Sequence, residues 1–133
     1  MILGKGLTTK AMEGSAEKGA SFLVVDPVTG LKTDFEITVK GKDSLTYRDA
    51  AKAASKKMAS KLDGKKELTN DEAILAGVEM IAPCISSWSG VKDENEKDID
   101  CTIENVKKYL IEYKWLADQV IKAMENRSLF FYE

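Results

Sequence analysis

The chain has 133 residues, which suits one compact domain with a buried core and is too short for two ordinary domains. Apolar residues make up 44% and charged residues 32% of it, which is typical of a globular protein and excludes a disordered or fibrous one. The chain contains no histidine, so Ser-His-Asp and Cys-His catalytic sites and histidine-containing zinc sites are excluded.

The net charge of -2 hides a charge asymmetry along the chain. Residues 1–66 carry 13 basic and 8 acidic side chains, whereas residues 67–133 carry 7 basic and 14 acidic ones. The two halves can therefore attract each other or different partners. The sequence contains neither a run of about 20 apolar residues nor a signal peptide, so we expect a cytoplasmic protein with no membrane partner.

The N-terminal residues 1–20 show no sustained hydrophobic period and predict a loosely ordered arm, followed by a single domain over residues 21–133. Within that domain, residues 21–40 contain two apolar runs around Asp26-Pro27-Val28-Thr29-Gly30, whose composition is typical of a turn. The second run alternates apolar and polar residues. Residues 21–40 therefore predict a β-hairpin.

The period changes to that of a helix after residue 46. Thr46 and Asp49 have the spacing of a capping box, and Gly64 is a plausible C-terminal stop. A second capping box, Thr69 with Glu72, begins a more apolar helix, which we expect to form the centre of the core. Pro83 predicts a kink or an end of that helix.

Residues 86–101 are polar and acidic and predict a long loop. Thr102 can cap a further helix with an apolar stripe at Ile103, Val106, Leu110 and Tyr113, followed by a break near Lys114 and more helix. The helical part then spans residues 46–127. The predicted fold is α+β and dominated by helices, with an N-terminal β-hairpin packed on three or four helices.

Seven basic residues lie within the range Arg48–Lys66 and could bind along a phosphate backbone. No aromatic residue alternates with these lysines to stack on bases, so a solvated helix face is the favoured interpretation and nucleic acid is an unlikely partner. The acidic segment matches a calcium loop at Asp93, Asn95 and Glu104, but Lys97 and Asp98 stand where a ligand and a glycine are required.

Both cysteines are expected to be unreactive, Cys84 through burial and Cys101 through nearby carboxylates. The sequence also lacks a phosphate-binding glycine loop. We therefore expect no enzymatic activity, no cofactor and no metal site. Aromatic residues are the remaining candidates for function, and most of them should belong to the core. The protein-binding candidates are Trp88, Trp115, Leu129, Phe130, Phe131 and Tyr132.

The last 50 residues resemble the tail assembly chaperones of long-tailed bacteriophages. The resemblance rests on Trp88-Ser89-Gly90-Val91, an acidic linker, Thr102-Ile103-Glu104-Asn105-Val106, the segment Tyr113-Lys114-Trp115-Leu116-Ala117-Asp118-Gln119-Val120, and Arg127 with Leu129-Phe130. Where members of that family often have proline before the second tryptophan, this chain has Lys114.

The resemblance implies a non-enzymatic chaperone in the cytoplasm of the bacterial host. Such a protein binds the long tape measure protein and assists assembly of tail tube protein around it, and it is absent from the mature virion. Two alternatives stay open. One is a small nucleic-acid-binding or regulatory protein that uses the basic helix, and the other is a structural virion protein such as a connector. Self-association also stays open.

Overall fold

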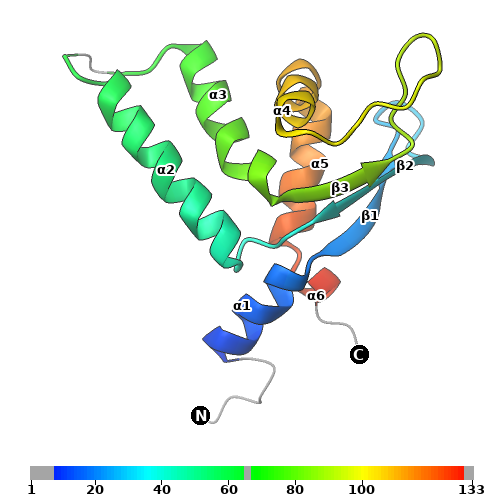
Figure 1. Ribbon diagram of the computed structural model, residues 1–133, viewed down its shortest axis with the longest axis horizontal. Coiled ribbons are helices and arrows are strands. Elements are labelled where there is room, and N and C mark those ends of the chain that lie inside the picture. Colours follow the sequence, from blue (N-terminus) through cyan, green and yellow to red (C-terminus); the bar gives the residue numbers. More distant parts are fainter. Residues whose placement is uncertain (1–7, 65–66, 131–133) are drawn as a thin grey trace.

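The computed structural model describes residues 8–64 and 67–130. These residues form a three-stranded sheet and six α-helices, with the first and last of these helices at the same end of the molecule (Figure 1). In chain order the elements are α1 (Thr9–Lys18), β1 (Ala20–Val25), β2 (Lys32–Val39), α2 (Leu45–Lys61), α3 (Asn70–Ile81), a 3-10 turn (Ala82–Cys84), β3 (Ile85–Ser89), α4 (Ile103–Glu112), α5 (Lys114–Glu125) and α6 (Arg127–Phe130). The predicted α+β fold with its N-terminal hairpin is confirmed.

The sheet has the order β1-β2-β3, with both neighbouring pairs antiparallel. The hairpin turn forms as predicted, because Asp26 Oδ1 accepts hydrogen bonds from the amides of Val28 and Thr29. Strand β3 was not predicted, since residues 86–101 suggested only a loop. Its polar Ser86, Ser87 and Ser89 hide the strand pattern, and pairing with β2 instead supplies its structure.

The core lies between the inner face of the sheet and helices α4 and α5. Its most deeply buried large side chains are Val24, Ile37, Val39, Val106, Leu110, Leu116, Val120 and Met124. Helix α3, which the sequence favoured as the central element, buries only Ala76, Val78 and Ile81 and leaves Ile74 51% exposed. Helix α3 therefore belongs to the core through Val78 and Ile81, but it shares the core with α4 and α5 and is not its single central element.

Helices α2 and α3 form a hairpin that projects from one side of the sheet (Figure 1). Helix α2 has a single buried residue, Ala54. Thr69 and Glu72 make the predicted capping box at the start of α3, and the helix ends at Ile81, two residues before Pro83. None of the helices in the described residues is long and apolar enough to cross a membrane.

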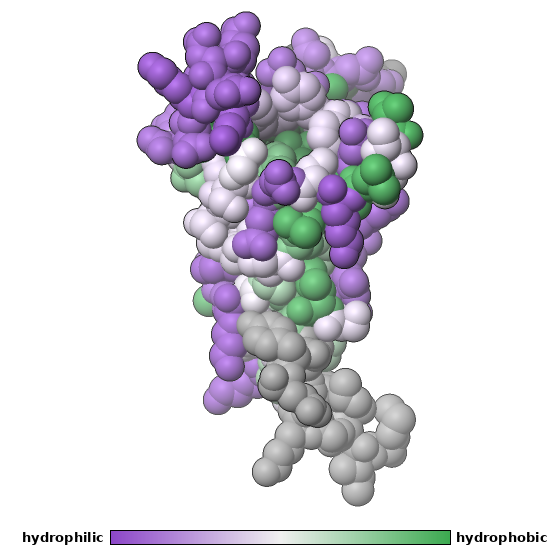
Figure 2. Space-filling model, turned by 90° about the vertical axis from the view of Figure 1, so that its right-hand side faces the viewer, coloured by the Kyte–Doolittle hydropathy of each residue, from purple (hydrophilic) through white to green (hydrophobic). Residues whose placement is uncertain are grey.

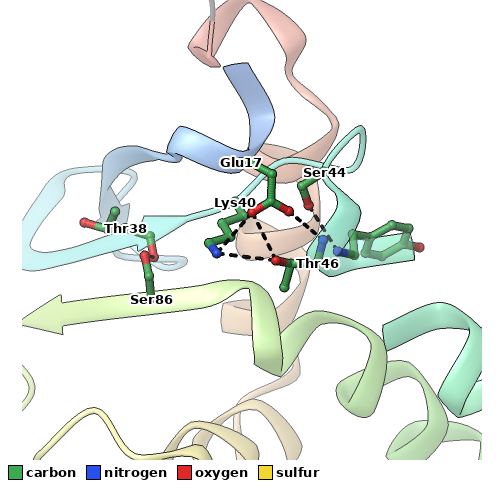
Figure 3. A network of polar contacts seen from close by, with 7 residues as sticks. Glu17, Thr38, Lys40, Ser44, Thr46 and Ser86 are labelled. Carbon is green, nitrogen blue, oxygen red and sulfur yellow. Dashed lines mark hydrogen bonds and ion pairs between the residues drawn. The ribbon is translucent and has the colours of Figure 1, made fainter. Parts of the chain in front are cut away.

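Residues 9–18 form helix α1, where the sequence suggested a loose arm. Its position is fixed by contacts with distant residues (Figure 3). The carboxylate of Glu17 accepts hydrogen bonds from the Thr46 amide at 2.6 Å and the Thr46 hydroxyl at 3.2 Å, and it lies 3.2 Å from Lys40 Nζ. A short helix with little apolar period gains its stability from such tertiary contacts.

Helix α2 begins earlier than the sequence predicted, and the contacts of Glu17 with Thr46 explain the difference. The N-cap is the buried Ser44, whose Oγ accepts a hydrogen bond from the Tyr47 amide at 3.1 Å, and not Thr46 as the capping-box pattern predicted. Thr46 lies inside the first turn of α2, where its amide and hydroxyl donate to Glu17 and its hydroxyl accepts a hydrogen bond from Lys40 Nζ at 3.3 Å. A capping pattern in the sequence was thus overridden by an acid on α1.

Candidate functional site: an aromatic row and a basic groove

Five aromatic side chains form a continuous row from the sheet to the junction of α4 and α5. Ring centroids are 5.9 Å apart for Phe35 and Trp88, 5.9 Å for Trp88 and Tyr109, 5.8 Å for Tyr109 and Tyr113, and 6.1 Å for Tyr113 and Trp115. The first two contacts are edge-to-face and the third is stacked, which are the favourable geometries for aromatic pairs. The row links strands β2 and β3 with helices α4 and α5.

Trp88 fixes the inner end of this row. It pairs with Ile37 across the sheet, so its side chain points to the core face, and its indole Nε1 donates to the carbonyl oxygen of Ile99 at 2.8 Å. Gly90 follows with a φ of +82°, and a Cβ there would lie 2.4 Å from the carbonyl oxygen of Asp34. Trp88 and Gly90 thus have structural roles.

The outer end of the row is exposed. Helix α4 ends at Glu112, and Tyr113 leaves helical geometry with φ -114° and ψ 87° before α5 begins at Lys114. The break predicted near Lys114 is therefore confirmed, without a proline. Tyr113 is 37% exposed, Trp115 38% and the nearby Ile111 46%. The sequence placed Tyr113 on the apolar stripe of α4 and Trp115 among the protein-binding candidates, and at the break both side chains are partly exposed to solvent.

The C-terminal candidates lie at the opposite end of α5 (Figure 1). Phe130 is 5% exposed and packs near Gly41, so it belongs to the core. Leu129 is partly buried and lines a groove of about 420 Å³ between β1 and α5, together with Phe22 and Leu23. Phe131 and Tyr132 lie outside the described residues. The described binding candidates therefore divide between two ends of the molecule.

Other residues in the segments that carry the family resemblance, between Trp88 and Phe130, stabilise the fold. Thr102 caps α4, and the side-chain amide of Asn105 donates to the Asp100 carbonyl oxygen. The Gln119 side chain exchanges two hydrogen bonds with the backbone of Val25, at 2.8 and 2.7 Å, and thereby covers part of the free edge of β1. Arg127 donates two hydrogen bonds to Asp43, at 2.7 and 3.0 Å.

The basic face of α2 borders a groove of about 540 Å³ near the start of the helix. Its lining combines four cations with small or aromatic side chains, namely Lys42, Tyr47, Arg48, Ala51, Lys52, Ser55 and Lys56. The sequence indicated that these cations lie on one solvated face of a helix, but it did not indicate a groove. The groove depends on Lys42, which precedes α2, and on the small side chains of Ala51 and Ser55.

Both thiols resist ionisation as the sequence suggested, but for Cys101 the cause is burial and not the nearby carboxylates. Burial raises the pKa of the Cys84 thiol to about 11, and burial also raises the pKa of Cys101. Neither thiol is therefore appreciably ionised at neutral pH. In the acidic loop, Asp93 accepts hydrogen bonds from the amides of Asn95 and Lys97. Within the described residues, His, Cys, Asp and Glu side chains form no group of three that could hold a metal ion.

Comparisons with known proteins place the chain in a family. A family model described as YdaY prophage protein matches residues 41–131, which is more than half of the chain. The matched range runs from the link after β2 to the end of α6 and includes the basic groove and the exposed end of the aromatic row. No curated protein and no solved structure matches the chain.

Proposed function

The chain belongs to the YdaY prophage protein family, and from that premise we propose that it is a non-enzymatic chaperone of phage tail assembly. In this proposal it binds the tape measure protein in the bacterial cytoplasm, assists assembly of the tail tube protein around it, and leaves before the virion is mature. The prophage family supports the phage setting, and the resemblance of residues 88–130 to tail assembly chaperones supports the specific task.

The observation that carries the proposal is the exposed outer end of the aromatic row. Tyr113 and Trp115 are both more than one third exposed, although their rings lie 6.1 Å apart and continue a row that is anchored in the sheet. Aromatic side chains held in fixed positions lose little conformational entropy on binding, which makes them effective anchors at protein interfaces. A surface of this kind fits the apolar stripe of an amphipathic helix.

This surface is also small, which suits a chaperone that must release its partner. Besides the two aromatic residues, the neighbouring Ile111 contributes an exposed apolar side chain at the end of α4. Three such residues cannot form an interface as large as those of permanent complexes. We therefore expect reversible binding that is driven by apolar contact and is only weakly reduced by salt.

The proposal can be tested by co-expressing the chain with the tape measure protein of the same prophage. We expect the tape measure protein to become soluble and to co-purify with the wild-type chain. The double variant Y113A/W115A should lose most of this effect, because it removes both aromatic anchors. The control V28A/L31A removes two exposed apolar side chains from the hairpin turn, 90% and 69% exposed, and should behave like the wild type.

The outcomes separate the proposal from its alternatives. A tape measure protein that stays insoluble with the wild-type chain would contradict the proposed function. Equal loss in both double variants would show that solubility does not depend on the aromatic surface. Finding the chain in purified virions at a fixed copy number would instead support a structural component of the particle.

A further inference from the structure

The basic groove on α2 is lined by small and aromatic side chains as well as by cations. Tyr47, Ala51 and Ser55 are the uncharged lining residues, and Lys42 Nζ stands 6.0 Å from the centre of the Tyr47 ring. Helix α2 buries only Ala54, so this side of the helix has no large partner within the described chain. The basic groove is therefore open to solvent and is bordered by positively charged side chains.

Two of the four cations around the groove are neutralised and two are not. Lys42 pairs with Glu125 at 2.9 Å, and Arg48 pairs with Glu13 at 3.0 Å. Lys52 and Lys56 form no ion pair with any residue in the described ranges. They stand one helical turn apart, and like charges at this spacing repel each other. An occupant with carboxylates would relieve this repulsion.

The loop between β3 and α4 has the complementary charge. Residues 93–100 contain five carboxylates against one lysine, and Figure 2 shows hydrophilic side chains gathered at the top of the face on which this loop lies. Glu94, Glu96, Asp98 and Asp100 are all exposed. The loop is also preorganised, because a bridge joins Lys92 and Asp98 and the Asp93 carboxylate accepts two backbone hydrogen bonds. A preordered loop loses less entropy on binding.

We propose that the basic groove of one copy binds the acidic loop, residues 93–100, of a second copy of this chain. Helix α2 and the loop after β3 lie on different sides of the sheet (Figure 1), so a copy does not fill its own groove. The contact is therefore head-to-tail, and an open chain of copies keeps one free groove at one end and one free loop at the other until a ring closes. This surface is separate from the exposed aromatic residues, so partner binding and self-association use different parts of the molecule.

The chemistry of the groove favours an acidic protein loop over nucleic acid. Phosphate backbones are bound by extended rows of cations, often with aromatic side chains that stack on bases. Here only Lys52 and Lys56 keep unpaired charges in the groove, and the Tyr47 ring lies beside Lys42. The net charge of the chain is -2, which gives no long-range attraction for a polyanion.

Sedimentation velocity of the full chain over a range of concentrations tests the proposal. At about 50 mM NaCl we expect self-association, and about 500 mM NaCl should weaken it at least about tenfold through screening. The variants K52E/K56E and E94K/E96K should each raise the dissociation constant about tenfold or more, because each places like charges opposite one another. The control K61E/K108E makes the same change in net charge as K52E/K56E, but at exposed lysines outside the groove, and should associate like the wild type.

Combining the two charge reversals gives the decisive result. The fourfold variant K52E/K56E/E94K/E96K exchanges the charges at these four positions, so that glutamates in the groove face lysines in the loop, and it should regain self-association. An equimolar mixture of K52E/K56E and E94K/E96K should likewise associate, although neither variant does so alone. Circular dichroism of each variant checks that the fold is kept.

Three results would overturn the proposal. The first is a wild-type chain that stays monomeric at low salt at every concentration. The second is a fourfold variant that stays monomeric when the wild type associates. The third is a monomeric chain that binds a fluorescent single-stranded oligonucleotide in a manner abolished by K52E/K56E, which would assign the groove to a phosphate backbone.

Discussion

The sheet with helices α4 and α5 differs sharply from the α2–α3 hairpin in how it is held together. Helix α5 buries three of its 12 residues, Leu116, Val120 and Met124, against the sheet. Helix α2 buries one of 17, Ala54, and contacts α3 through small side chains and an ion pair between Lys57 and Glu79 at 3.1 Å. The first region owes its stability to apolar burial, whereas in the second α2 leaves most of its surface exposed and α3 supplies the contacts with the core.

The largest effect should come from a cavity in the better-packed region. Leu110 on α4 is 2% exposed, so Leu110→Ala should lower the free energy of unfolding by about 2–5 kcal/mol. The matched change Ile74→Ala on α3 removes a side chain that is 51% exposed and should cost less than about 1 kcal/mol. Urea unfolding of both variants measures the difference. Equal losses would show that the two regions do not differ in packing.

A second contrast compares two glycines with positive φ. A Cβ at Gly90 would lie 2.4 Å from the Asp34 carbonyl oxygen, and we expect Gly90→Ala to cost about 2–3 kcal/mol. Gly64, at the end of α2, also has a positive φ but has open space around it, so Gly64→Ala should cost only about 1 kcal/mol. Thermal unfolding ranks the two variants. A smaller effect at position 90 than at position 64 would contradict the close approach of the backbone.

A third prediction concerns Glu17, which joins α1 to the start of α2 and to the end of β2. Burial raises the pKa of Glu17, but hydrogen bonds from Thr46 and the ion pair with Lys40 outweigh it, and the net pKa lies below its usual 4.5. The ionised carboxylate therefore stabilises the fold above that value, and the contribution disappears as the pH falls through the lowered pKa. Glu17→Gln should cost about 1 kcal/mol at pH 7.

Unfolding measured from pH 7 to pH 3 checks this prediction. The difference between wild type and Glu17→Gln should shrink as the pH falls below 4.5. Glu13→Gln is the control, because Glu13 pairs with Arg48, which is half exposed, and a pair of this kind contributes less than about 1 kcal/mol. A difference between wild type and Glu17→Gln that does not depend on pH would rule out the charged network as its cause.

The smallest effect should be a gain of stability in the α2–α3 hairpin. Gly77 lies within α3, is exposed, and has no atom within 4 Å of an added Cβ. Gly77→Ala should therefore stabilise the chain by about 0.5–1 kcal/mol, because alanine restricts the unfolded chain and favours the helix. If the melting temperature rises and self-association stays unchanged, the substitution has stabilised the helix without altering the groove. A fall in melting temperature would indicate that position 77 has a close neighbour.

The sequence predicted those elements whose signals lie within a few residues. Asp26 and Gly30 specified the hairpin turn, Thr69 with Glu72 specified the start of α3, and Thr102 specified the start of α4. Each of these signals is a contact between residues at most four positions apart. Local hydrogen bonds and apolar periods are sufficient for such elements.

The candidate site was predicted less well. Trp115 and Trp88 were identified as candidates, but the sequence gave no sign that they belong to one row or that only the outer end of the row is exposed. Phe130 was grouped with them, yet it packs into the core beside Gly41. Exposure of an aromatic residue depends on what covers it, and that is set by distant segments.

The sequence by itself determined the helix and strand periods, the hairpin, two helix caps and the absence of histidine chemistry. Tertiary structure alone decided helix α1, strand β3, the start of α2 at Ser44, and the groove on α2. Helix α1, strand β3 and the start of α2 depend on residues far apart in the chain, since Glu17 reaches Thr46 and Thr38 pairs with Ser87. Such contacts form only when the whole chain has folded, because no local pattern specifies which distant segment will lie alongside.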